Sequence, residues 1–133
     1  MRTITDHKLN GLNDALTITV LDEPGQGGAC HEYAIERIAP EDGPGFRDAA
    51  TQEWHDATII KFQNGPIKEA GVNGISGEAL LAVVIDRLRC FQKGEFACRD
   101  NAVALTKLEE SLMWLQKRTR DREARGVEGT NQK

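Results

Sequence analysis

The chain has 133 residues, of which 39% are hydrophobic and 29% charged, and its formal net charge is −4. This length allows one modest core, and no apolar run approaches the ~20 residues that cross a bilayer, so a membrane-spanning protein is excluded. The N-terminal residues resemble no signal peptide, so we expect a cytosolic protein. The cysteines are Cys30, Cys90 and Cys98. Their number is odd and they lack CxxC spacing, so neither a disulfide framework nor a metal or cofactor site is expected.

The first part of the chain predicts an antiparallel sheet. Residues 16–21 alternate apolar and threonine side chains, which predicts a half-buried strand. Turn residues 22–28 separate it from a second alternating stretch at 30–38, so the two strands should form a hairpin. Gly25-Gln26-Gly27-Gly28 resembles a dinucleotide loop only superficially, because a strand follows it and not a helix.

Past this hairpin, the sequence predicts a surface loop and a third strand. Residues 39–54 contain prolines and glycines and show no clean period, which favours a loop. Residues 57–63 are predicted to form the third strand, which Asn64-Gly65-Pro66 ends.

The second half of the chain changes to a helical period. Ser76 can cap a helix, and Gly94 is its predicted stop. Its apolar positions are Leu81, Val84, Ile85 and Leu88. A second helix carries a coiled-coil-like seam made of Leu105, Leu108, Leu112 and Leu115. The two helices are therefore predicted to pair as an antiparallel hairpin.

Together these elements predict an α+β fold, with a small antiparallel N-terminal sheet packed with a C-terminal antiparallel two-helix hairpin. We expect a single domain over 1–133, with a β-rich part over about 1–75, the hairpin over 76–125 and a tail over 126–133. Met113 and Trp114 place apolar bulk beside the seam, so we expect oligomerisation through the helices. The polar tail is expected to be either disordered or held by a partner subunit.

The distribution of charge is uneven along the chain. Residues 1–56 hold four basic and eleven acidic residues, whereas residues 117–125 hold five basic and two acidic ones. The basic segment is either a local anion site or a solvated helix end whose cations lie near the negative pole of the helix. A protein that binds nucleic acid would normally carry an excess of basic residues throughout the chain, and this one does not.

Motifs of catalysis are missing from the sequence. There is no GxSxG, HExxH or Walker lysine loop, and the three histidines are far apart in the chain. Glu109 and Glu110 are expected to lie on a solvated helix flank. We therefore predict no catalytic residue and a protein that is not an enzyme.

Four stretches of the second half resemble the helical hairpin of a phage immune-evasion family. They are Phe91-Gln92, Glu95 to Leu105, Trp114 to Arg122 and Gly126 to Thr130. The family includes the first type of Thoeris anti-defence sponge and the anti-CBASS cyclic nucleotide sponges, and the N-terminal strands look more like the Thoeris branch. The resemblance implies a phage protein of the host cytoplasm, without membrane or DNA partners, that assembles into a homo-oligomer, namely a hexamer.

The function implied by the resemblance is sequestration. The ligand would be a cyclic ADP-ribose isomer, glycocyclic ADP-ribose, which a TIR enzyme makes and which the sponge binds intact. Blocking Thoeris immunity would then need no catalysis. Two alternatives stay open: a signal-degrading enzyme, and a phage regulator that binds nucleic acid or protein.

The resemblance also implies ligand-binding residues. Phe91 and Arg118 would stack on the adenine, while Asn101 and Arg37 would hold the polar part of the signal. From the residues alone, Phe91 could instead continue the Leu88 face as a core residue. Arg37 could be a solvated cation at a strand end, and Asn101 could cap or fix the register of the helical seam. Arg120, Arg122 and Arg125 are candidates for a second site that binds CBASS cyclic oligonucleotides.

Overall fold

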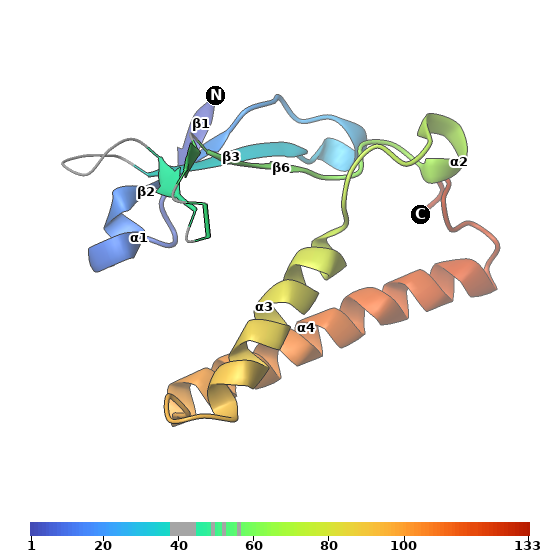
Figure 1. Cartoon of the computed structure of the whole chain (residues 1–133). Coiled ribbons are helices and arrows are strands. Elements are labelled where there is room, and N and C mark those ends of the chain that lie inside the picture. The colour runs from blue at the N-terminus through green and yellow to red at the C-terminus, as the bar shows by residue number, and fades with distance from the viewer. Residues whose placement is uncertain (38–44, 49, 52, 56) are drawn as a thin grey trace. The chain divides into compact units, whose positions relative to one another are not determined.

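The computed structural model describes residues 1–37, 45–48, 50–51, 53–55 and 57–133, which fall into two compact units. The first unit is Met1–Asn64 and the second is Gly65–Lys133. The division lies ahead of the predicted boundary near residue 75, because a short helix and its flanking turns belong with the helical unit. An α+β chain with an N-terminal sheet and C-terminal helices is confirmed (Figure 1). Its organisation as one domain stays a prediction.

The first unit is built on a four-stranded antiparallel sheet in the order β1-β2-β3-β6. The strands are β1 (Arg2–Ile4), β2 (Leu16–Val20), β3 (Glu32–Arg37) and β6 (Thr58–Lys61). Strands β2 and β3 pair from Leu16 opposite Arg37 to Val20 opposite Tyr33. The predicted hairpin and the third predicted strand are therefore confirmed. The end of the second predicted strand, Ile38, lies outside the described residues.

The turn between β2 and β3 is closed by the Asp22 carboxylate. It accepts hydrogen bonds from the backbone N–H groups of His31, at 2.9 and 3.1 Å, and Glu32, at 3.1 Å. Burial raises the pKa of Asp22, but these backbone hydrogen bonds outweigh burial and hold the pKa below its ordinary value. The short 3₁₀ turn η1 (Gln26–Gly28) needs glycine because Gly27 has a φ of 74°.

The core of this unit is small. Among the described residues of this unit, Val20 and Ala34 are the fully buried apolar ones, at 1% and 2% exposure, and the His31 side chain is buried as well. Tyr33 and Phe62 pack edge to face, with ring centroids 5.7 Å apart. The sheet therefore depends on a few well-packed side chains.

Several short elements escaped the sequence prediction. They are β1, α1 (Gly11–Ala15), β4 (Phe46–Arg47), β5 (Trp54–His55) and α2 (Ile67–Ala70). Of the loop predicted over 39–54, residues 39–44, 49 and 52 lie outside the described residues. The loop prediction was wrong for Phe46, Arg47 and Trp54, because β4 pairs with β5. Between these strands the Asp48 side chain closes a turn by accepting from the Ala50 and Thr51 amides.

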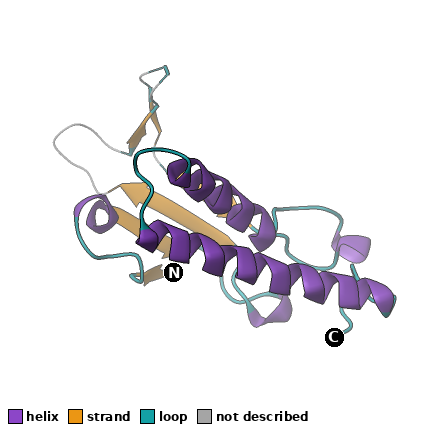
Figure 2. Cartoon of the chain, turned by 90° about the horizontal axis from the view of Figure 1, so that it is seen from below, coloured by secondary structure: helices purple, strands orange, loops and turns teal. Residues whose placement is uncertain are grey.

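The second unit is built on an antiparallel hairpin of α3 (Gly77–Gln92) and α4 (Arg99–Ala124), which lie side by side in Figures 1 and 2. The predicted cap is confirmed, since the Ser76 hydroxyl accepts from the Ala79 amide at 3.1 Å. Helix α3 ends two residues before Gly94, the predicted stop. The hairpin itself is as predicted.

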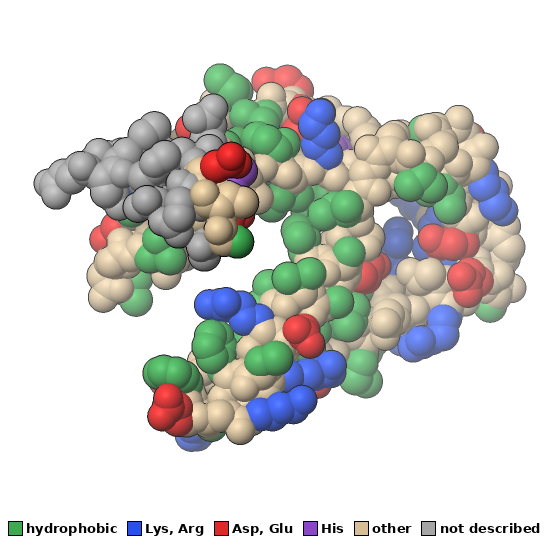
Figure 3. Space-filling model, in the orientation of Figure 1, with side chains coloured by type: hydrophobic (Ala, Val, Ile, Leu, Met, Phe, Trp, Pro, Cys, Tyr) green, Lys and Arg blue, Asp and Glu red, His purple; other side chains and the backbone are tan. Residues whose placement is uncertain are grey.

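Two contacts fix the register of this hairpin. The Gln92 side-chain amide donates to the Cys98 carbonyl at 3.2 Å and accepts from the Cys98 N–H at 3.1 Å, which closes the turn. Arg89 pairs with Glu109 at 2.7 Å. Ile85 is the fully buried apolar side chain of this unit, at 2% exposure. Apolar positions such as Val83, Met113 and Trp114 remain exposed, and hydrophobic side chains are visible along the hairpin in Figure 3.

The end of α4 turns the chain back on itself. Gly126 has a φ of 73°, its N–H donates to the Glu123 carbonyl, and the Val127 N–H donates to the Arg122 carbonyl, both at 3.0 Å. This is a Schellman motif, in which a left-handed glycine satisfies the last carbonyls of a helix. The following tail contacts its own chain, since the Lys68 N–H donates to the Gly129 carbonyl at 3.2 Å. The expectation of a disordered tail is thereby corrected, and contact of the tail with a partner subunit stays a prediction.

Candidate functional site

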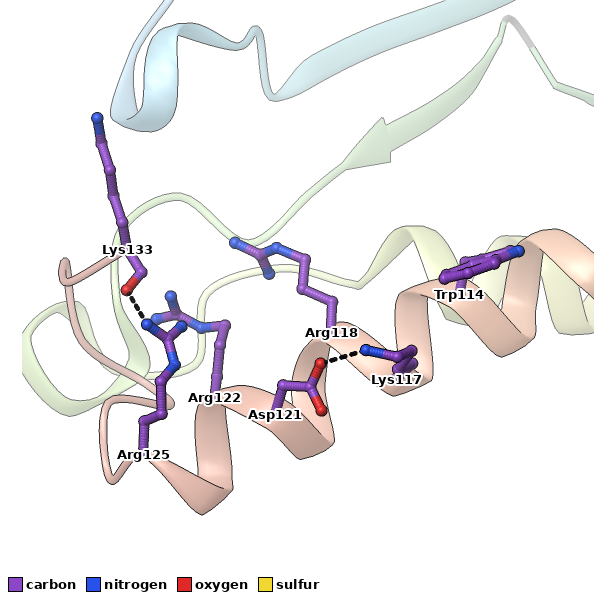
Figure 4. A pocket seen from close by; sticks show the side chains of 7 residues that line it. All are labelled: Trp114, Lys117, Arg118, Asp121, Arg122, Arg125 and Lys133. Atoms are coloured by element: carbon purple, nitrogen blue, oxygen red, sulfur yellow. Dashed lines mark hydrogen bonds and ion pairs between the residues drawn. The ribbon is translucent and has the colours of Figure 1, made fainter.

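A cavity of about 390 Å³ lies along the C-terminal part of α4 (Figure 4). Its lining residues are Trp114, Lys117, Arg118, Asp121, Arg122, Arg125 and Lys133. The six helical positions recur at steps of three and four residues, which places them on one stripe of the helix. One aromatic ring and five cations therefore face the same space, against a single carboxylate.

Basic side chains outnumber acidic ones in the lining of this cavity, although Arg122 is itself paired with Glu128 at 2.9 Å. Lys117 pairs with Asp121 at 2.6 Å, one turn further along the helix. The hydrogen bond from Lys117 lowers the pKa of Asp121 most; burial opposes it, and the charges of Lys117, Arg125 and Arg120 add to the lowering. A field that keeps this carboxylate ionised also favours a bound phosphate.

Arg118 provides the chemistry that best suits a nucleotide. Its side chain is exposed, and it lies one helical turn beyond Trp114, which is 63% exposed. In Figure 4 the Arg118 guanidinium extends away from the axis of α4 into the cavity. A planar guanidinium can stack on a base and also bring charge to a diphosphate.

Phe91 lies at the other end of the hairpin, in the last turn of α3. Its ring is half-buried and packs edge to face on Phe96, with centroids 6.4 Å apart. The Arg87 guanidinium carbon lies 4.9 Å from the centroid of the Phe91 ring. Phe91 is thus already part of an aromatic and cationic cluster that the sequence reading missed, although Arg87 precedes it by one helical turn.

Asn101 lies at the same end of the hairpin as Phe91, where Gln92 and Cys98 join the end of α3 to the start of α4. It is in the first turn of α4 and is half-buried, and its backbone N–H donates to the Cys98 sulfur at 3.4 Å. Arg118 is on the same helix, and a rise of about 1.5 Å per residue separates it from Asn101 by roughly 25 Å. The structure thus places Phe91 and Asn101 at the same end of the hairpin and Arg118 towards the other end of α4.

Arg37 belongs to the first unit. It ends β3, opposite Leu16, and its side chain is half-buried. The ligand roles of Arg37, Phe91, Asn101 and Arg118 stay predictions.

The three arginines of the predicted second site differ in their surroundings. Arg120 is exposed. Arg125 donates to the Lys133 backbone oxygen at 2.6 Å, which is drawn in Figure 4. Arg122 is 7% exposed, and its guanidinium donates hydrogen bonds to the tail of the chain. The three arginines look alike in the sequence. The structure shows that the Arg122 guanidinium is buried and hydrogen-bonded to the tail, whereas Arg120 is exposed.

The described residues contain no group of three or more His, Cys, Asp or Glu side chains placed to hold a metal ion. No helix within the described ranges is long and apolar enough to cross a membrane.

Comparison with known proteins relates this hairpin to a phage family. The family described as Acb2/Tad1, hairpin domain, matches residues 55–120, a range that includes Phe91, Asn101 and Arg118. The chain is also 61% identical over 74 residues to Thoeris anti-defense 1 of Bacillus phage SBSphiJ7. This match covers 56% of the chain and 52% of the relative, so the chain spans about half the length of the curated relative. Residues 55–120 therefore form a hairpin domain of the Acb2/Tad1 family, which confirms the resemblance in the sequence.

Proposed function

We propose that this chain is a phage anti-defence protein that sequesters glycocyclic ADP-ribose, a cyclic ADP-ribose isomer made by a TIR enzyme. By binding the signal without degrading it, the protein would block Thoeris immunity in the host cytoplasm. The observation that carries the proposal is the 61% identity to a protein named Thoeris anti-defense 1. The cationic cavity with Trp114 at its edge supports it, because its chemistry suits an aromatic base with a diphosphate.

The binding chemistry assigns a role to each predicted residue. Phe91 and Arg118 stack on the two faces of the adenine, and each stacking contact contributes about 1–3 kcal/mol. Asn101 and Arg37 bind the polar part of the signal. Charge-assisted hydrogen bonds to the diphosphate add to stacking, and a nanomolar site needs about −12 kcal/mol in total.

The length of α4 supports a site that is shared between two chains. Stacked atoms lie about 3.5–4.0 Å apart, so both partners must sit within a few ångströms of the same base. Within one chain, Arg118 is roughly 25 Å further along the helix than Asn101, which lies at the same end of the hairpin as Phe91. Phe91 of one protomer and Arg118 of another would therefore form the sandwich.

The surface of the hairpin supports assembly as well. Val83 is 65% exposed, Met113 64% and Trp114 63%, so the hairpin leaves apolar side chains that another protomer can cover. We propose a homo-oligomer, with the hexamer that the family resemblance implies as its state.

Complementation between two variants tests the shared site. Phe91→Ala and Arg118→Ala chains, each prepared alone, should lose at least about tenfold in affinity for glycocyclic ADP-ribose by calorimetry. When the two are co-expressed, random assembly should restore about a quarter of the sites, those that combine the intact Phe91 of one chain with the intact Arg118 of another. Lys107→Ala, at an exposed cation of α4 without a predicted role, is the matched control. If the mixed assembly shows no high-affinity site, the proposal that Phe91 of one protomer and Arg118 of another bind the same base is contradicted.

The two alternatives predict other results. A signal-degrading enzyme would release an altered molecule when the complex is heated. A nucleic-acid-binding regulator would shift DNA or RNA in a gel, and the shift would weaken steeply as salt rises. Neither result is expected here.

A further inference from the structure

The Arg122 guanidinium is buried at the end of α4, where it donates hydrogen bonds to the C-terminal tail of the chain. Its Nε donates to the Glu128 carboxylate at 2.9 Å, and one Nη donates to the carbonyls of Val127, at 2.9 Å, and Thr130, at 3.1 Å. The other Nη donates to the Gln132 carbonyl. Four of the five donors of this side chain therefore bind residues 127–132.

The tail in turn holds α2. The Gly129 carbonyl accepts from the Lys68 N–H at 3.2 Å, and the Asn131 side chain donates to the Glu69 carboxylate at 3.1 Å. Gly129 has a φ of 78°, and a Cβ placed there would lie 3.1 Å from the Ile67 side chain. Only glycine allows the tail to approach α2 this closely.

We infer that Arg122 is a positioning residue that fastens the tail to α4 and thereby builds the wall of the cavity beside Arg118. The same tail carries Lys133, which lines the cavity and whose backbone oxygen binds Arg125. Loss of the Arg122 contacts would release α2 on one side and the Lys133 and Arg125 side chains on the other. The consequence for the ligand rests on the function proposed above.

The geometry distinguishes this role from direct contact with the ligand. A buried guanidinium that already donates to three carbonyls and a carboxylate has one donor left, so an approaching phosphate would have to displace tail contacts. Arg118, in contrast, has no ion-pair partner among the described residues and extends into the cavity.

The test compares three full-length variants by hydrogen exchange. Arg122→Gln removes the anchor, and Gly129→Val blocks docking of the tail from its own side without any change of charge. Lys107→Gln is the matched control, since Lys107 is an exposed cation of the same helix. In Arg122→Gln and Gly129→Val, exchange of the Lys68 amide should accelerate by at least about tenfold. Exchange along α3 should stay as in the wild type, which verifies that the hairpin is folded.

Affinity for glycocyclic ADP-ribose supplies the second readout. Arg122→Gln and Gly129→Val should lower the affinity by the same factor, and the double variant should be no weaker than either single variant. Additive losses would show that Arg122 contacts the ligand directly, and unchanged affinity with a released tail would reduce Arg122 to a structural anchor; both outcomes overturn the inference. If the wild type fails to bind this probe, the proposed function fails, and the inference then stands or falls on exchange of the Lys68 amide.

Discussion

Replacement of Ile85 by alanine tests how the hairpin is held together. Ile85 is 2% exposed and is the one fully buried apolar side chain among the residues of the second unit, all of which the structure describes. Truncation of a buried isoleucine to alanine costs about 2–5 kcal/mol, from lost burial and from the cavity left behind. Val83→Ala on the same helix is the matched control, and since Val83 is 65% exposed its cost should be within about 0.5 kcal/mol.

Urea denaturation followed by far-ultraviolet circular dichroism measures both costs, because α3 and α4 supply most of the helical signal. The series should be repeated over a range of protein concentrations, since association stabilises a folded oligomer by mass action. Equal costs for Ile85→Ala and Val83→Ala at low concentration would refute the reasoning. The hairpin would then depend on contacts between protomers rather than on its own core.

Three further predictions follow from particular side chains and surfaces. Arg118→Lys keeps the charge and loses the planar face, so its affinity for glycocyclic ADP-ribose by calorimetry should lie between those of the wild type and Arg118→Ala; equality with the wild type would contradict stacking. The pKa of Asp22 is lowered in the fold, so its carboxylate stabilises the protein above the unfolded value near 3.8, and this contribution is lost as pH falls through the folded value. Asp22→Asn should therefore flatten the acid limb of a melting-temperature profile, and an unchanged limb would refute the role of the turn contacts. Light scattering should report several times 14.7 kDa, and a monomer at micromolar concentration would contradict assembly.

The sequence predicted elements that carry a long or regular pattern. Residues 16–21 alternate cleanly, and β2 occupies Leu16–Val20. The leucine seam likewise predicted α4, and Ser76 predicted the start of α3. The two-residue strands β4 and β5 are too short to show any period in the sequence.

The candidate site was predicted less completely than the fold. The sequence identified the basic segment. It does not show which of its arginine side chains already donate hydrogen bonds to other residues of the chain. Arg122 is six residues before Glu128, and the intervening Gly126 turns the chain so that the two side chains meet at 2.9 Å. Similarly, the Arg87 guanidinium lies over the Phe91 ring because the two residues are one helical turn apart, a spacing that the sequence already shows.

Recovery of the bound molecule tests the central proposal most directly. The protein is incubated with the product of an active TIR enzyme, separated from free ligand and then heated, and the released small molecule is identified by mass spectrometry and applied to the Thoeris effector. Sequestration predicts that intact glycocyclic ADP-ribose is released and that it activates the effector again. Release of a chemically altered molecule, or of none, would contradict the account.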